Sequence, residues 1–203
     1  MKIDLHNDKT VMTGIQDSGK TYVAKHLVKM FKKPIVYAVH GYEWEDAPDK
    51  VTVFVPKDYS LPSFNEFCRK IIAEIKATDS YGKDKVTKSY DAIFIDEFDY
   101  FFSNNVDITN YQWINDIFIN HSHYRIALIG MTRRVQDIPT KFFESSRHRF
   151  IFAVEGENAQ RKIFNIHPKM QELLPQLSVE NHWFIYHRIG YTPLLIEKVE
   201  TIK

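Results

Sequence analysis

Apolar residues along this chain alternate between short continuous runs and longer stretches with helical spacing. Six runs predict strands, at residues 9–13, 35–39, 51–55, 92–95, 126–130 and 150–153. Most are continuously apolar, as in strands that a parallel sheet buries on both faces. A helix is predicted where Phe64, Phe67, Cys68, Ile71, Ile72 and Ile75 recur with a spacing of three to four residues. Ser63 is the expected N-cap of that helix.

The order of these elements predicts the fold class. Helical spacing over residues 23–31 and 113–118 places further helices between strands, and residues 158–173 predict one or two short helices. Strands that alternate with helices predict a three-layer α/β sandwich around a mainly parallel sheet. Residues 183–186 and 193–199 predict a C-terminal antiparallel hairpin around Gly190. Without a repeat or an evident linker, residues 1–203 are expected to form a single domain.

Composition and charge narrow the classes of function. The chain has 203 residues, of which 44% are hydrophobic and 26% are charged, as in globular proteins. A net charge of +1 gives the whole molecule no strong attraction for a polyanion. The single cysteine, Cys68, excludes an internal disulfide and a four-cysteine zinc site. The first residues resemble no signal peptide, and no run of apolar residues predicts a transmembrane segment.

A glycine-bearing loop between the first predicted strand and helix carries the clearest chemistry. Its residues are Gly14, Ile15, Gln16, Asp17, Ser18, Gly19, Lys20 and Thr21, with the spacing of a P-loop. Backbone N–H groups of such a loop surround phosphates, and the following helix N-terminus adds positive potential. Lys20 is expected on the β- and γ-phosphates, and the Thr21 hydroxyl on Mg²⁺. Gly14, Asp17, Ser18, Gly19, Lys20 and Thr21 are the predicted ATP-binding residues.

Two carboxylates end the predicted strand at 92–95. Ligands bind at the carboxyl ends of strands in open α/β sheets, so Asp96 and Glu97 are expected near the P-loop. Asp96 is the predicted Mg²⁺ ligand with Thr21, and Glu97 is the candidate general base that activates water. Asp99 is interpreted as a helix-start or surface acid. A catalytic glutamate favours hydrolysis coupled to motion over phosphoryl transfer to a metabolite.

The predicted strand at 126–130 continues into Met131, Thr132, Arg133 and Arg134. In the expected sheet order this strand lies between the P-loop strand and the acidic strand. Thr132 would then sit near the γ-phosphate, where a polar side chain can orient water and sense the phosphate. The alternative is a strand that simply ends in a polar turn.

These motifs together resemble the FtsK–HerA superfamily of DNA-pumping ATPases. The resemblance rests on residues 14–21, residues 93–97 and the block 132–139, and continues through 149–152, Glu157 and Arg161. The short chain resembles the genome-packaging ATPases of internal-membrane icosahedral viruses, including the archaeal turreted icosahedral viruses. Members commonly have glutamine after the sensor threonine, where this chain has Arg133.

The resemblance implies a ring, usually a hexamer, that threads double-stranded DNA into a viral capsid or packaging vertex with ATP hydrolysed at subunit interfaces. The resemblance also implies that the protein is located in the cytoplasm of an infected cell, and association with the virion is a further expectation. An isolated chain is expected to be able to exist as a monomer. Ring motors donate a cation across the interface, and Arg125 and Arg147 are the preferred candidates, with Arg149 a third. Lys83, Lys85 and Lys88 either contact DNA phosphates or form a solvated basic loop.

The sequence is compatible with two other functions. A nucleotide or nucleoside kinase would use the same P-loop and phosphorylate a small acceptor. An ATP-gated assembly or adaptor protein would bind ATP and recruit partners without pumping DNA, with the aromatic segment 98–102 as a docking surface.

Overall fold

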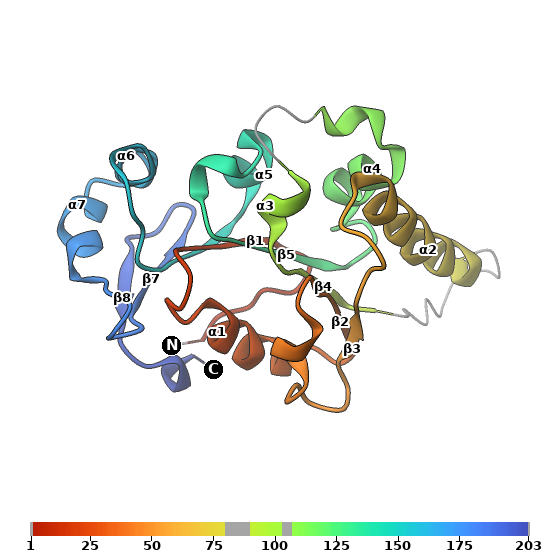
Figure 1. The fold of residues 1–203 in the computed structure, drawn as a ribbon, viewed down its shortest axis with the longest axis horizontal. Helices are drawn as coiled ribbons and strands as arrows, with labels where there is room; N and C mark the ends of the chain where they lie inside the picture. Colours follow the sequence, from red (N-terminus) through yellow and green to blue (C-terminus); the bar gives the residue numbers. More distant parts are fainter. Residues whose placement is uncertain (1, 80–89, 103–106, 203) are drawn as a thin grey trace.

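The computed structural model describes residues 2–79, 90–102 and 107–202. Within them the chain forms one eight-stranded sheet in the order β3-β2-β4-β5-β1-β6-β7-β8 (Figure 1). The strands are β1 (Lys9–Thr13), β2 (Pro34–Tyr37), β3 (Thr52–Phe54), β4 (Ala92–Ile95), β5 (Ala127–Thr132), β6 (His148–Ile151), β7 (Phe184–Arg188) and β8 (Leu194–Ile196). All six predicted strand runs are present, with ends shifted by up to two residues.

The direction of the strands places their chemistry at one edge. Strands β1 to β6 pair in parallel, so their carboxyl ends lie together. Strands β7 and β8 are antiparallel and form the predicted C-terminal hairpin. The P-loop strand β1 lies between β5 and β6, and β5 separates β1 from the acidic strand β4, as expected.

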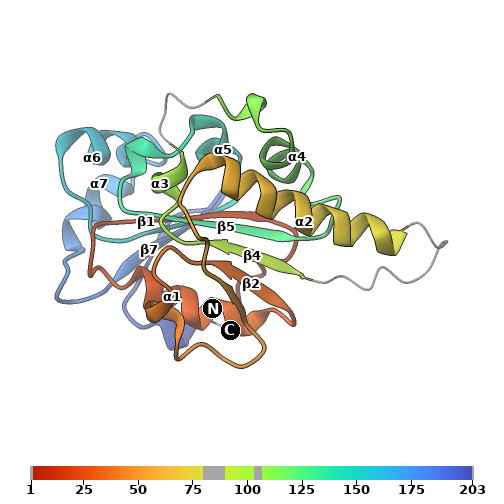
Figure 2. The ribbon, with the colours of Figure 1, turned by 45° about the vertical axis from the view of Figure 1, so that its right-hand side comes forward.

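Helices cover both faces of the sheet, which confirms the predicted three-layer α/β fold. They are α1 (Lys20–Leu27), α2 (Leu61–Asp79), α3 (Phe98–Phe101), α4 (Gln112–Asn120), α5 (Thr140–Ser145), α6 (Glu157–Phe164) and α7 (Met170–Leu173). Figure 2 shows α1 and the two ends of the chain on one face and α2 to α6 on the other. Helix α2 begins at Leu61, before Ser63. The Ser63 amide instead donates a hydrogen bond to the Ser60 hydroxyl at 3.3 Å. The predicted cap was therefore too late in the sequence.

Each face of the sheet carries its own apolar core, because side chains alternate along a strand. Val11 points into the core under α2 to α6, whereas Met12 points into the core under α1. Both residues are almost fully buried. The central parallel strands β2, β4 and β5 are buried on both faces, which explains their continuous apolar runs in the sequence. Among the described residues, no helix is long and apolar enough to cross a bilayer.

An aromatic cluster beneath the carboxyl end of β2 contains a polar atom without a partner. The Tyr37 ring contacts Phe64 and Phe67 at centroid distances of 4.9 and 4.8 Å. Its hydroxyl is buried and makes no hydrogen bond to the described residues. Burial also raises the pKa of this phenol. The ring therefore stabilises the core while the hydroxyl costs free energy.

We expect Tyr37→Phe to raise the free energy of unfolding by about 1 kcal/mol, because it removes an unsatisfied buried hydroxyl and keeps the ring. For a chain of this length the melting temperature should rise by about 2–4 °C. Tyr59→Phe is the matched control, since the Tyr59 hydroxyl donates to the Val39 carbonyl at 2.9 Å and its loss should destabilise the protein. A melting temperature that falls in Tyr37→Phe would contradict the assignment.

Candidate functional site

The P-loop joins β1 to α1 and is pinned by its neighbours in the sheet. The Gly14 amide donates to the Thr132 carbonyl at 3.2 Å, and the Ile15 amide donates to the Ala153 carbonyl at 2.8 Å. A Cβ at Gly14 would lie 2.5 Å from Cβ of Phe152, so only glycine fits there. The loop is thus anchored between the carboxyl ends of β5 and β6.

The turn into α1 requires left-handed backbone at two positions. Asp17 has φ of 60° and Gly19 has φ of 95°. Glycine adopts this region at low cost, and aspartate tolerates it better than most residues. The Asp17 side chain is exposed, while Ser18 is buried and donates to the Ile15 carbonyl at 2.7 Å. This hydrogen bond closes the loop on itself.

Lys20 brings a half-buried positive charge to the loop. Its Nζ donates to the carbonyl oxygens of Gly14 and Ile15, each at 2.7 Å. Burial lowers the pKa of this ammonium group, an effect that Glu97 and Asp96 partly oppose. Both hydrogen-bond partners of the ammonium are neutral carbonyl oxygens, so an anionic phosphate would be a stronger partner.

The carboxyl end of β4 delivers Asp96 into the same region. Asp96 is 4% exposed; its Oδ2 accepts from Trp44 Nε1 at 3.2 Å, and its Oδ1 accepts from the Glu97 amide at 3.1 Å. Burial raises the pKa of Asp96 to about 6, and the negative charges of Glu97 and Glu43 add to that effect. A bound cation would favour the charged form of this carboxylate.

Glu97 is held by Arg133, which follows the last residue of β5. The backbone of Glu97 is left-handed, with φ of 51°. Oε1 of Glu97 accepts from Nε and Nη2 of Arg133 at 2.9 and 2.7 Å. The Oε2 atom is buried and makes no hydrogen bond to the described residues. The ion pair therefore orients the carboxylate and leaves one oxygen without a partner.

The polar residues after β5 have separate contacts. The Thr132 hydroxyl donates to the Arg134 carbonyl at 3.1 Å, and Thr132 is buried at the cavity wall. Arg133, rather than Thr132, reaches the candidate base. Asp99, interpreted from sequence as a helix-start or surface acid, does lie in the first turn of α3. Its Oδ1 is buried and makes no hydrogen bond within the described ranges, and burial raises its pKa.

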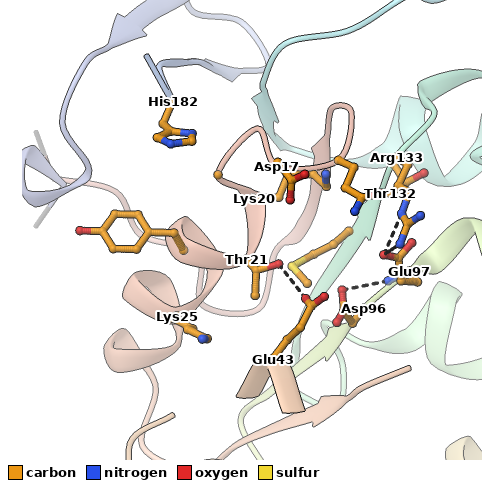
Figure 3. A pocket seen from close by; sticks show the side chains of 14 residues that line it. Asp17, Lys20, Thr21, Lys25, Glu43, Asp96, Glu97, Thr132, Arg133 and His182 are labelled. Atoms are coloured by element: carbon orange, nitrogen blue, oxygen red, sulfur yellow. Dashed lines mark hydrogen bonds and ion pairs between the residues drawn. The ribbon is translucent and has the colours of Figure 1, made fainter. Parts of the chain in front are cut away.

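These side chains line one cavity of about 450 Å³, shown from close by in Figure 3. The structure brings together Asp17, Gly19, Lys20, Thr21, Asp96, Glu97, Thr132 and Arg133, and adds Gln16, Tyr22, Lys25, Glu43, Met131 and His182. Glu43 faces Thr21, whose hydroxyl donates to Glu43 Oε2 at 3.3 Å. His182 lies against Gly19 on the opposite side from Glu97.

Glu43 and Trp44 were missed from the sequence. They lie in a 3₁₀ turn, Gly41–Trp44, that follows β2 and carries no recognisable motif. One signal could have found them. Strand β2 is adjacent to β4 in the sheet, so the turn after β2 reaches the same edge as Asp96.

The oxygen donors at this edge suit Mg²⁺. The Thr21 hydroxyl and the carboxylates of Asp96 and Glu43 are hard ligands of the type that Mg²⁺ prefers. Across the described ranges, no group of three His, Cys, Asp or Glu side chains is arranged to hold a metal ion. The residues present therefore fit a metal that shares its coordination with phosphate oxygens and water, as Mg²⁺ does in nucleotide sites.

The candidate arginines lie away from this cavity. Arg125 and Arg147 are exposed and precede β5 and β6, at the amino ends of the strands. The length of β5 puts that edge roughly 15–20 Å from the P-loop. Arg149 is buried within its own chain, unlike a residue that projects toward a neighbour. Lys83, Lys85 and Lys88 lie outside the described residues.

Residues 10–155 match the ATPase family associated with various cellular activities (AAA). This match covers the P-loop, the acidic strand end and β5. No curated protein matches the chain in sequence.

Solved structures share the fold over almost the whole chain. The genome-packaging NTPase B204 of Sulfolobus turreted icosahedral virus 2, in complex with ATP-gammaS, has a TM-score of 0.69 at 18% identity, covering 95% of this chain and 98% of that one. B204 of Sulfolobus turreted icosahedral virus has a TM-score of 0.71 at 17% identity, covering 93% and 96%. The pCW3 conjugation coupling protein TcpA has a TM-score of 0.65 at 15% identity, covering 96% of this chain and 61% of that one. The predicted resemblance is confirmed at the level of the fold.

The Arg133–Glu97 ion pair can be tested in the nucleotide-free protein. A double-mutant cycle with Arg133→Gln and Glu97→Gln should give a coupling free energy of about 1 kcal/mol, because Glu97 is only 11% exposed. Chemical denaturation of the four proteins measures it. The exposed pair Arg161 and Glu157 is the control and should couple by only about 0.3–0.5 kcal/mol. Equal coupling in both pairs would show that Arg133 does not hold Glu97 in solution.

Proposed function

The chain belongs to the ATPase family associated with various cellular activities, and from this membership we propose that it is a Mg²⁺-ATP-driven translocase that packages double-stranded DNA into a preformed viral capsid. The observation that carries the ATPase part is the convergence of Lys20, Thr21, Asp96 and Glu97 on one cavity. The proposed role in DNA packaging rests on the structural similarity to the packaging NTPase B204.

In the proposed reaction, the P-loop amides and Lys20 bind the phosphates of ATP. Lys20 would exchange its two carbonyl partners for phosphate oxygens. Phosphate oxygens carry a negative charge, which the carbonyl oxygens lack. Thr21 and Asp96 would hold Mg²⁺, with Glu43 beside them. When bound, Mg²⁺ supplies charge neutralisation on the phosphate oxygens.

Glu97 is the proposed general base, and its orientation suggests which oxygen acts. Arg133 occupies Oε1 through two hydrogen bonds, whereas Oε2 has no partner among the described residues. Oε2 is therefore the atom that would accept the proton of the attacking water. Thr132 lies at the same wall and would help to position that water.

DNA packaging is supported by the extent of the structural likeness. This chain and the B204 packaging NTPase cover each other almost completely, so the shared fold is the whole of that protein rather than one of its domains. We propose that this chain performs the same task in the cytoplasm of an infected cell. Its partner would be a capsid vertex, and the protein would remain associated with the virion. Residues 1–203 would act as one ATPase domain.

A homo-oligomeric ring, a hexamer by resemblance, would complete the site. Arg125 and Arg147 lie at the edge of the sheet opposite the P-loop, and so could not reach the phosphates of their own subunit. Their exposure would allow either one to reach the phosphates of a neighbour. A cation donated in this way stabilises the charge of the transferring phosphate.

Hydrolysis and binding should separate in two variants. Glu97→Gln should retain binding of ATP-gammaS but slow steady-state ATP hydrolysis by about 10²–10⁴-fold, the range for a lost general base. Lys20→Ala should lose productive nucleotide binding as well. Glu157→Gln, at an exposed position outside the cavity, is the control and should hydrolyse ATP at the normal rate. Normal hydrolysis in Glu97→Gln would remove Glu97 as the base.

The DNA assignment is tested by the ATPase rate with and without double-stranded DNA, together with native mass. DNA should stimulate hydrolysis, and the stimulated species should be a ring. Single-stranded DNA of equal nucleotide concentration is the control for charge alone. A monomer that hydrolyses ATP without regard to DNA would contradict packaging. Turnover of a small phosphate acceptor would then indicate a kinase, and binding without turnover an adaptor.

A further inference from the structure

Arg149 is a buried cation whose hydrogen bonds all go to neutral acceptors. It lies on β6 and is 8% exposed. Its Nη2 donates to the carbonyl oxygens of Phe143 and Glu144, both at 3.3 Å, and its Nη1 donates to His187 Nδ1 at 3.3 Å. Its Nε is buried and makes no hydrogen bond to the part of the chain that the structure describes. Among the described residues, no carboxylate forms an ion pair with it.

The nearest acid does not fill this role. Glu144 opposes the lowering of the Arg149 pKa that burial causes, but it contacts the guanidinium through its main-chain carbonyl. The Glu144 side chain is itself exposed. Buried charges in proteins are normally paired, and arginine cannot escape the cost by losing its proton. Arg149 therefore lacks an anionic partner.

Arg149 opens onto a cavity of about 440 Å³ that no acid lines. This basic pocket is formed by Arg149, Ile166, His167, His187 and residues 189–192 of the β7–β8 turn. The His167 Nδ1 accepts from the Lys169 amide at 3.1 Å, which leaves its Nε2 protonated as a donor. The Nε2–H of His167 is therefore one hydrogen-bond donor of the pocket.

The electrostatics of the pocket favour an anion over a cation. Burial lowers the pKa of His187 to about 4, and the positive charge of Arg149 contributes to the lowering. An anion among these groups would reverse that contribution. The planar guanidinium that lines this pocket is suited to oxyanions such as phosphate.

The rim of the pocket adds a surface for a larger ligand. Ile189 and Tyr191 are 46% and 60% exposed, and the Arg188 guanidinium lies 5.0 Å from the centroid of the Tyr191 ring. An exposed aromatic ring beside a phosphate site can stack on a base. The cavity is also nearly as large as that at the P-loop, more than one phosphate ion requires.

We propose that the basic pocket binds a phosphate group that belongs to a nucleotide or to a nucleic-acid backbone. It is separate from the P-loop cavity, because the two share no lining residue. Arg149 lies near the amino end of β6, whereas the P-loop packs against the carboxyl end of that strand. The site therefore does not depend on the chemistry proposed for the P-loop.

The test uses the full chain with Lys20→Ala, so that the P-loop contributes little to phosphate binding. Inorganic phosphate, AMP and acetate are titrated while the imidazole NMR signals of His167 and His187 are recorded. We expect phosphate and AMP to shift these signals and acetate to bind more weakly. Adding Arg149→Met should weaken phosphate binding by about 10–100-fold, because a charge-assisted contact is lost. The same substitution at exposed Arg161 is the control and should change nothing.

A second variant keeps the test decisive if Arg149→Met does not fold. Tyr191→Ala removes an exposed ring. It should weaken the binding of AMP by about 10-fold and leave the binding of inorganic phosphate unchanged. A short DNA duplex that shifts the same signals would identify the backbone as the source, and a response to AMP alone would identify a free nucleotide. Equal binding of acetate, a response to inorganic phosphate only, or shifts that persist in Arg149→Met would each overturn the proposal.

Discussion

The P-loop site depends on a half-buried ammonium group kept apart from the carboxylates around it. Lys20 Nζ contacts the carbonyl oxygens of Gly14 and Ile15, while Glu97 is bound by Arg133. A direct Lys20–Glu97 ion pair would neutralise the cation and fill the space that a phosphate needs. By taking up Glu97, Arg133 leaves the positive charge of Lys20 available to an anion. Burial then strengthens that attraction, because the surrounding dielectric is low.

Strand order converts this local arrangement into a site. Because β5 lies between β1 and β4, the residues after β5 reach both the loop and the acids, and this allows Arg133 to contact Glu97. Because β2 lies on the other side of β4, the following turn delivers Glu43 to Thr21 and Trp44 to Asp96. The same parallel sheet thus supplies the loop, the acids and their hydrogen-bond partners from four separate segments.

Much of this architecture was predictable, since continuous apolar runs and a P-loop are local signals. Strands β1 and β4 have the predicted bounds, and the order of β1, β5 and β4 was anticipated. The partners of the site residues were not predictable. Glu43 is 22 positions from Thr21, and Arg133 is 36 positions from Glu97. Such pairings follow from packing of the complete sheet, and no period in the sequence records them.

The two cation sites can be compared through the chemistry of their side chains. Partly buried lysines relieve an uncompensated charge by a lowered pKa, as at Lys20 and at Lys9, whose pKa falls to about 8. Their neutral contacts therefore indicate an anion only where a motif such as the P-loop also points to one. Arginine retains its charge in proteins, so Arg149 cannot be relieved in this way. A buried guanidinium whose hydrogen-bond acceptors among the described residues are all neutral is consequently a stricter sign of an anion site than a lysine in the same position.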